Sequence, residues 1–170
     1  EISAALKRMV IKSPVVAFLT GHGERSIDGI GERDYYAFSQ YKDFRNSLVN
    51  QGFESISLSL DSVNKVPENI DILVISDVRT ALSPKEQEII ENYIAEGRNL
   101  LIAGEPRRQE QMNPLLAPLG LSFMPGILVQ ESKDFSTDLI LANPTMASLN
   151  VINRFDKLLA FGNQITMPSA

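Results

Sequence analysis

The sequence predicts a three-layer α/β domain of the flavodoxin-like type, in which helices cover both faces of a mostly parallel sheet. Short apolar runs alternate along the chain with amphipathic helical patterns. Such alternation is typical of parallel strands joined by right-handed crossovers. The length of 170 residues also suits one hydrophobic core. We therefore expect a single domain over residues 1–170, with residues 1–12 as a flanking segment.

The first strand is predicted at residues 15–20, which form an almost continuous apolar run followed by a glycine-containing turn. A run of this kind is typical of a strand buried on both faces. From residue 35 onward, apolar side chains recur at spacings of four, three and four residues, at Ala37, Tyr41, Phe44 and Leu48. We expect one crossover helix there, which ends at Gly52.

The middle of the chain gives the clearest element boundaries. Serines alternate with apolar residues over 55–60, which predicts a half-exposed strand near the edge of the sheet. Residues 70–75 and 99–103 are apolar enough for central strands. Between them, Ser83, Pro84 and Glu86 have the pattern of a capping box that starts a helix. Gly97 supplies a left-handed cap at the end of that helix.

Beyond residue 104 the patterns are weaker. Asn113 and Pro114 predict the start of a short helix that ends at Gly120. Later strands are expected at residues 127–130 and 139–142, a helical turn from residue 143, and an edge strand at 155–161. The predicted order of strands in the sheet is 2-1-3-4-5.

Composition excludes several classes of function. The net charge of −5 disfavours a nucleic-acid partner, because it repels a phosphate backbone. The absence of Cys excludes disulfides, thiolate metal sites and cysteine nucleophiles. The chain begins with Glu1 rather than Met, and we expect it to be an excised fragment or a processed product.

In this architecture, ligands bind beyond the carboxyl ends of the strands. The segments at that edge are residues 20–34, 76–82 and 104–109. The candidate ligand-binding residues that they contain are Gly21, His22, Gly23, Glu24, Ser76, Asp77, Glu105 and Arg107. His22 could act as a general base, a metal ligand or a hydrogen-bond donor, or it could simply order a tight turn. Arg79, Arg107 and Arg108 could hold an anionic or hydroxyl-rich ligand, or could be solvated.

Standard catalytic motifs are absent from the sequence. Ser26 stands where a dinucleotide fingerprint needs Gly or Ala, and the chain contains no Gly-Lys-Ser/Thr sequence. Ser76 lacks the flanking glycines of a nucleophile elbow, so we interpret it as a cap or turn residue. Glu24, Asp77 and Glu105 could converge on a hard cation, or could be solvated acids at strand ends. We assign no catalytic residue, no metal and no cofactor.

Three segments together resemble a known family: residues 17–24 (Ala-Phe-Leu-Thr-Gly-His-Gly-Glu), 70–75 and 82–102. They are similar to the extracytoplasmic domain of the GldG-like auxiliary proteins of ABC transport systems, first associated with gliding motility in Bacteroidetes. The similarity covers about residues 12–145, and Thr-Gly-His-Gly-Glu at a strand end is its most specific part.

The resemblance implies a fold like that of class I glutamine amidotransferases, on the periplasmic face of the inner membrane, tethered by membrane helices outside this chain. It also implies a non-enzymatic role, with the membrane and ATPase subunits of an ABC transporter or another auxiliary subunit as partners. Sugar binding is proposed for the wider group. The chain lacks the amidotransferase Cys, which agrees with loss of that activity. It also has Gly104-Glu105-Pro106 where many relatives have Asp-Pro.

The leading hypothesis is therefore a non-catalytic binding or scaffolding domain. One alternative is a metal- or His-assisted hydrolase of a carbohydrate or ester, which requires His22 and Glu24 within hydrogen-bond reach of Asp77 or Glu105. The other alternative is a pure protein-interaction module, in which Met124, Leu128 and residues 139–141 form an exposed apolar patch.

Overall fold

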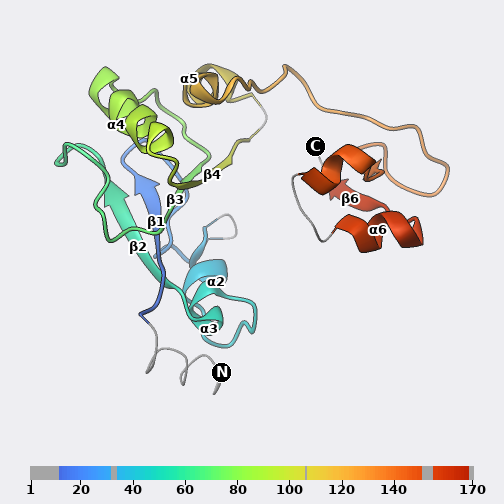
Figure 1. The fold of residues 1–170 in the computed structure, drawn as a ribbon, viewed down its shortest axis with the longest axis horizontal. Coiled ribbons are helices and arrows are strands. Elements are labelled where there is room, and N and C mark those ends of the chain that lie inside the picture. Colours follow the sequence, from blue (N-terminus) through green and yellow to red (C-terminus); the bar gives the residue numbers. More distant parts are fainter. Residues whose placement is uncertain (1–11, 32–33, 106, 151–154, 169–170) are drawn as a thin grey trace. The chain divides into compact units, whose positions relative to one another are not determined.

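The computed structural model describes residues 12–31, 34–105, 107–150 and 155–168. The chain divides into two compact units, Glu1–Phe123 and Met124–Ala170 (Figure 1). No helix among the described residues is both long and apolar enough to cross a lipid bilayer.

The first unit is built on a parallel four-stranded sheet of the order β2-β1-β3-β4. The strands are β1 (Val15–Thr20), β2 (Glu54–Ser59), β3 (Ile72–Ser76) and β4 (Asn99–Ala103). This arrangement confirms the predicted fold class and the first four positions of the predicted order. β2 lies at an edge, as its alternating serines predicted. β4 forms the opposite edge of the described sheet, so the prediction of a central position for it is wrong.

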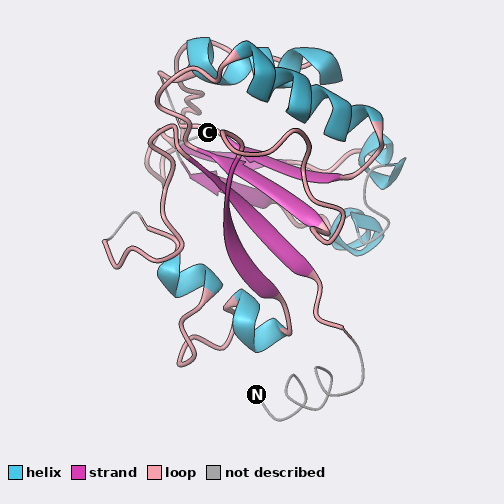
Figure 2. Cartoon of the chain, turned by 90° about the vertical axis from the view of Figure 1, so that its left-hand side faces the viewer, coloured by secondary structure: helices cyan, strands magenta, loops and turns pink. Residues whose placement is uncertain are grey.

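Helices cover the two faces of this sheet (Figure 2). On one face, α4 (Pro84–Ala95) and α5 (Gln109–Leu116) pack Ile90 and Met112 against Leu73 and Ile75. On the other face, Val16, Phe18 and Val74 pack with residues near the short helices α2 (Tyr36–Ser39) and α3 (Leu48–Gln51). Successive side chains of a strand point to opposite faces, so the apolar runs of β1 and β3 supply both cores.

The prediction of a single crossover helix from residue 35 to Gly52 is wrong. The structure has only α2 and α3 there, with turns between them, and Tyr41 and Phe44 are exposed. Polar side chains bind the backbone carbonyls that a continuous helix would use: the Asn50 amide donates to the carbonyls of Lys42 and Phe44, at 2.6 and 2.8 Å. Such local competition is a known way for side chains to interrupt helices.

α4 begins as the sequence predicted. The Ser83 hydroxyl accepts a hydrogen bond from the Glu86 backbone N–H at 3.4 Å, and the Glu86 carboxylate accepts one from the Ser83 N–H at 2.8 Å. The helix buries Ile89, Ile90 and Tyr93. After it, Gly97 has a φ of 69°, in the left-handed region predicted for a cap.

α5 begins at Gln109, four residues before the predicted start, and Pro114 lies inside it. Its apolar face, formed by Met112, Leu115 and Leu116, is buried. This burial offsets the loss of the backbone hydrogen bond that proline cannot make. The 3-10 turn η1 (Ala117–Leu119) follows, and Gly120 ends it with a φ of 69°, as predicted.

The second unit contains a separate antiparallel sheet formed by β5 (Leu139–Ala142) and β6 (Ile165–Pro168). The strand predicted at 139–142 is confirmed, but it does not extend the parallel sheet.

Residues 127–130 form no strand, and the helical turn expected from residue 143 is η2 (Met146–Asn150). Residues 155–161 are helix α6 (Phe155–Phe161) and not an edge strand. Their sequence contains Lys, Leu and Ala and no β-branched residue, which favours a helix.

Candidate functional site

The carboxyl ends of β1, β3 and β4 meet at one edge of the parallel sheet, and polar side chains from the loops beyond them form two groups. The histidine cluster consists of His22, Glu24, Ser83 and Glu86. The arginine cluster consists of Arg25, Asp77, Arg79, Glu105 and Arg108. Both clusters join loops that are far apart in the sequence.

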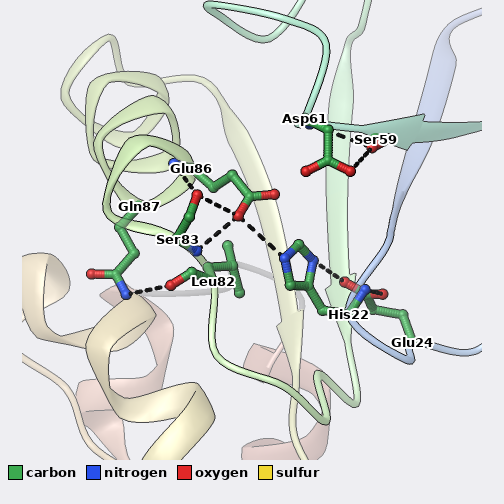
Figure 3. Close-up of polar contacts among 8 residues, drawn as sticks. All are labelled: His22, Glu24, Ser59, Asp61, Leu82, Ser83, Glu86 and Gln87. Atoms are coloured by element: carbon green, nitrogen blue, oxygen red, sulfur yellow. Dashed lines mark hydrogen bonds and ion pairs between the residues drawn. The ribbon is translucent and has the colours of Figure 1, made fainter.

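In the histidine cluster, the imidazole of His22 lies between two carboxylates (Figure 3). Its Nδ1 is 3.4 Å from Glu24 Oε1, and its Nε2 is 3.2 Å from Glu86 Oε2. The side chains of His22, Glu24 and Glu86 are only 11%, 1% and 4% exposed. The His22 imidazole therefore faces protein carboxylates and has little contact with solvent.

Glu86 is an ionised member of this cluster at neutral pH. Burial acts to raise the pKa of Glu86, but hydrogen bonds from the Ser83 hydroxyl and backbone N–H, together with the nearby His22, lower it further than burial raises it. The net result is a pKa below the ordinary value of 4.5. The carboxylate thus caps α4 and binds His22 at the same time.

The backbone conformation on both sides of His22 explains why its two neighbours are glycines. Gly21 has a φ of 122° and Gly23 has a φ of 80°, conformations that L side chains rarely adopt. A Cβ on Gly23 would also lie 3.1 Å from the Cβ of Arg79. In turn, the His22 carbonyl accepts hydrogen bonds from the backbone N–H groups of Arg79 and Thr80, at 2.9 and 3.1 Å. The Thr-Gly-His-Gly-Glu segment is therefore a tight turn bound to the loop after β3.

The arginine cluster is organised around Asp77, which directly follows β3 and is 3% exposed. Its Oδ2 lies 3.3 Å from Arg79 Nη2 and 3.8 Å from Arg25 Nε, and its Oδ1 lies 4.0 Å from Arg108 Nε. Arg25 also forms an ion pair with Glu105. The cluster thus links the loops after β1, β3 and β4 through charged groups.

The acids predicted to converge are divided between the two clusters. Glu24 contacts His22, whereas Asp77 and Glu105 are both paired with Arg25. Within the described part of the chain, no group of three or more histidine and acidic side chains is arranged to hold a metal ion.

Two of the other candidates lie elsewhere at the strand ends. Ser76 is buried and lines an apolar groove of about 410 Å³ on the α2 and α3 face of the sheet. Arg107 has a left-handed φ of 67° just beyond β4.

Sequence reasoning missed two members of these clusters. Glu86 was recognised only as a helix cap, although its position in the first turn of α4 leaves one carboxylate oxygen close to His22. Arg25 directly follows the Thr-Gly-His-Gly-Glu segment and was not singled out. No local pattern signals either contact, because the partner residues come from other loops.

Comparison with known proteins places this chain in a family. Residues 13–151, well over half of the chain, match the family model described as an ABC-type uncharacterized transport system. No curated protein and no solved structure matches the chain. The matched region contains both clusters and the whole parallel sheet. The chain therefore belongs to this family of auxiliary proteins of ABC transport systems.

Proposed function

We propose that the chain is a non-catalytic binding or scaffolding domain on the periplasmic face of the inner membrane, within a membrane-anchored auxiliary protein. Its partners are the membrane and ATPase subunits of an ABC transporter or another auxiliary subunit. The observation that carries this proposal is the linkage of three strand-end loops by two charged clusters inside the matched family region. Such linked loops form a preorganised surface for a ligand or partner.

The geometry of His22 supports a role without catalysis. A general base must reach a substrate proton within hydrogen-bond distance. Both ring nitrogens of His22 instead lie 3.4 and 3.2 Å from carboxylate oxygens of the protein, and the side chain is largely buried. In addition, Asp77 is paired with arginines. This arrangement gives the hydrolase alternative little support.

We further place the chain near the GldG-like, gliding-associated proteins, because the Thr-Gly-His-Gly-Glu segment carries that resemblance. In this proposal Gly21, His22, Gly23 and Glu24 shape the edge of the site. A carbohydrate or another small molecule would bind there through the polar side chains of the loops after β3 and β4, including Asp77, Glu105 and Arg107.

The test is co-purification of the transporter with the full-length, tagged protein from detergent-solubilised membranes. We expect the membrane and ATPase subunits of one ABC transporter to be retained, and a tagged, unrelated membrane protein from the same cells to retain neither. An Arg25→Gln, Asp77→Asn double variant, which loosens the linked loops, should reduce the recovery. Absence of transporter subunits in the wild-type eluate would contradict the proposal.

A pure interaction module is a second candidate, supported by the exposure of Met124 and Leu128 in the second unit. Residues 139–141 of β5 are half-buried. For this candidate, Leu128→Asp should abolish co-purification, whereas the Arg25→Gln, Asp77→Asn variant should not change it. The opposite result favours the strand-end surface.

A further inference from the structure

We infer that β4 is an interface at which two copies of this chain pair edge to edge about a two-fold axis, so that their four-stranded sheets join into one continuous sheet. This inference goes beyond the proposed function, because it concerns a contact of the chain with itself and needs no transporter subunit or ligand. It starts from the position of β4, which is the last strand of the sheet on the side away from β2 (Figure 1).

The two edges of the sheet differ in composition. In β2, serines alternate with apolar residues, and Ile56 and Leu58 pack against one core, which is the pattern of a strand with a single apolar face. β4 has the sequence Asn-Leu-Leu-Ile-Ala and carries apolar side chains on both faces. Edge strands are normally protected from pairing by charged residues, proline or a bulge. β4 contains no charged residue and no proline, so its composition is that of a strand with neighbours on both sides.

The apolar surface continues on both sides of β4. On the α4 and α5 face, Leu100 and Ile102 line a groove of about 430 Å³ together with Leu119 and Leu121. On the other face, Leu101 lines the apolar groove of about 410 Å³ that also contains Ser76. Leu101, Leu119 and Leu121 are 53%, 45% and 60% exposed. A strand added to β4 would point alternate side chains over the two grooves, so it must be apolar on both faces, and a second β4 meets this requirement.

The backbone of β4 presents hydrogen-bonding groups at the same edge. The Ala103 carbonyl accepts a hydrogen bond from the N–H of Asp77, which follows β3, at 2.9 Å. The backbone groups of Ala103 and of Leu101, two residues earlier, therefore point toward β3. Those of Leu100 and Ile102 point the opposite way, to the outer edge. Within the described part of the chain, β4 pairs with β3 alone, so these groups are in position for a second strand.

A two-fold axis through Leu101, perpendicular to the sheet, satisfies these groups. It makes the two copies of β4 antiparallel and uses the same patch on each copy, as an isologous interface requires. Leu100 of one copy then lies opposite Ile102 of the other, and each such pair can exchange both N–H···O=C bonds. Leu101 lies opposite its own counterpart at a position without mutual backbone hydrogen bonds, where the side chains come closest.

Disulfide cross-linking tests this register directly, because the chain contains no cysteine. Leu101→Cys would place two thiols opposite each other with a Cα separation of about 4.5 Å, within the range of a disulfide. Asn99→Cys is the matched control: Asn99 is exposed on the same strand and face, but its two copies would lie about 13 Å apart along the strands. With oxidised glutathione, we expect a covalent dimer of Leu101→Cys on a non-reducing gel and little of Asn99→Cys.

Sedimentation velocity of the 170-residue chain over a concentration series tests the interface without a cross-link. We expect a reversible monomer–dimer equilibrium, in which the dimer grows with concentration. Leu101→Lys puts like charges directly opposite each other on the axis and should leave only monomer. Ile30→Lys makes the same change in charge at a side chain that is 89% exposed in the loop after β1, and it should dimerise like the wild-type chain. Circular dichroism should show the same fold in all three proteins.

Three results would overturn the inference: a wild-type chain that is monomeric at every concentration, equal cross-linking of Leu101→Cys and Asn99→Cys, or equal dimerisation of Leu101→Lys and Ile30→Lys. Hydrogen exchange identifies a different occupant of the edge. Slow exchange of the Leu100 and Ile102 amides in a monomer would mean that another strand covers β4, which also contradicts the inference. Recovery of transporter subunits does not depend on Leu101, so the proposed function can survive the loss of this inference.

Discussion

His22 Nε2 lies 3.2 Å from Glu86 Oε2, although the two residues are 64 positions apart in the sequence. This contact joins the turn after β1 to the first turn of α4. The opposite ring nitrogen faces Glu24, which belongs to the same turn as His22. The only histidine of the chain is therefore a structural connection beneath the strand-end surface.

Removal of this imidazole should destabilise the fold. We expect His22→Ala to lower the free energy of unfolding by about 1–3 kcal/mol, because the buried Glu86 carboxylate loses its hydrogen bond to the imidazole and the buried Glu24 carboxylate loses the neighbouring ring. Urea unfolding measures the change. In a double-mutant cycle with Glu86→Gln, the two substitutions should cost less together than the sum of their separate effects. Simple additivity would show that the two side chains do not interact.

The capping box should contribute a measurable share of the stability of α4. Ser83→Ala removes the hydroxyl that accepts from the Glu86 N–H and donates to Glu86 Oε2 at 2.7 Å. The expected loss is about 1 kcal/mol. Ser62→Ala, at an exposed serine in a turn, is the control and should change the unfolding midpoint very little. Equal midpoints for the two variants would refute a capping role.

Stability should fall in acid partly because of Glu86. The pKa of Glu86 in the folded state lies below 4.5, so the folded state favours the ionised carboxylate more than the unfolded state does. The resulting stabilisation is fully present above the unfolded pKa and is lost as the pH falls through the lower, folded value. Unfolding free energies measured from about pH 7 to about pH 3 should therefore decline less steeply in Glu86→Gln than in the wild-type protein.

Glu88→Gln is the appropriate comparison for this pH series. Glu88 lies in the same helix and is exposed. Its substitution makes the same change in formal charge and should leave the acid dependence close to that of the wild-type protein. If Glu86→Gln and Glu88→Gln gave identical pH profiles, the special environment of Glu86 would be disproved.

Alanine substitutions at two glycines should distinguish the effect of backbone strain from that of steric crowding. Gly97 and Gly23 both have positive φ, 69° and 80°. An added Cβ at Gly97 meets no atom within 4 Å, whereas at Gly23 it lies 3.1 Å from Arg79 Cβ. Gly97→Ala should therefore cost about 1 kcal/mol from the backbone alone. Gly23→Ala should cost about 1 kcal/mol more from crowding, measured by thermal or urea unfolding. A smaller loss for Gly23→Ala would contradict the close packing of these loops.

Local patterns predicted the elements whose stability depends on nearby residues. β1 and β3 are continuous apolar runs, and the start of α4 is specified within four residues by Ser83 and Glu86. The prediction of one helix over residues 35–52 is wrong. Side-chain hydrogen bonds, such as those of Asn50, compete with the backbone hydrogen bonds of a helix, and the apolar spacing does not reveal them. The apolar character of residues 155–161 predicts a strand, but their residue types favour the helix that the structure has there.

Local sequence patterns are enough to predict the parallel sheet and the edge at which the candidate residues lie, because strand direction follows from the alternation of strands and helices. Which side chains meet at that edge depends on the folded chain as a whole. It paired His22 with Glu86, and Asp77 with Arg25, Arg79 and Arg108. These partners come from separate loops, and their contacts depend on strand register and loop conformation, which no short sequence pattern encodes.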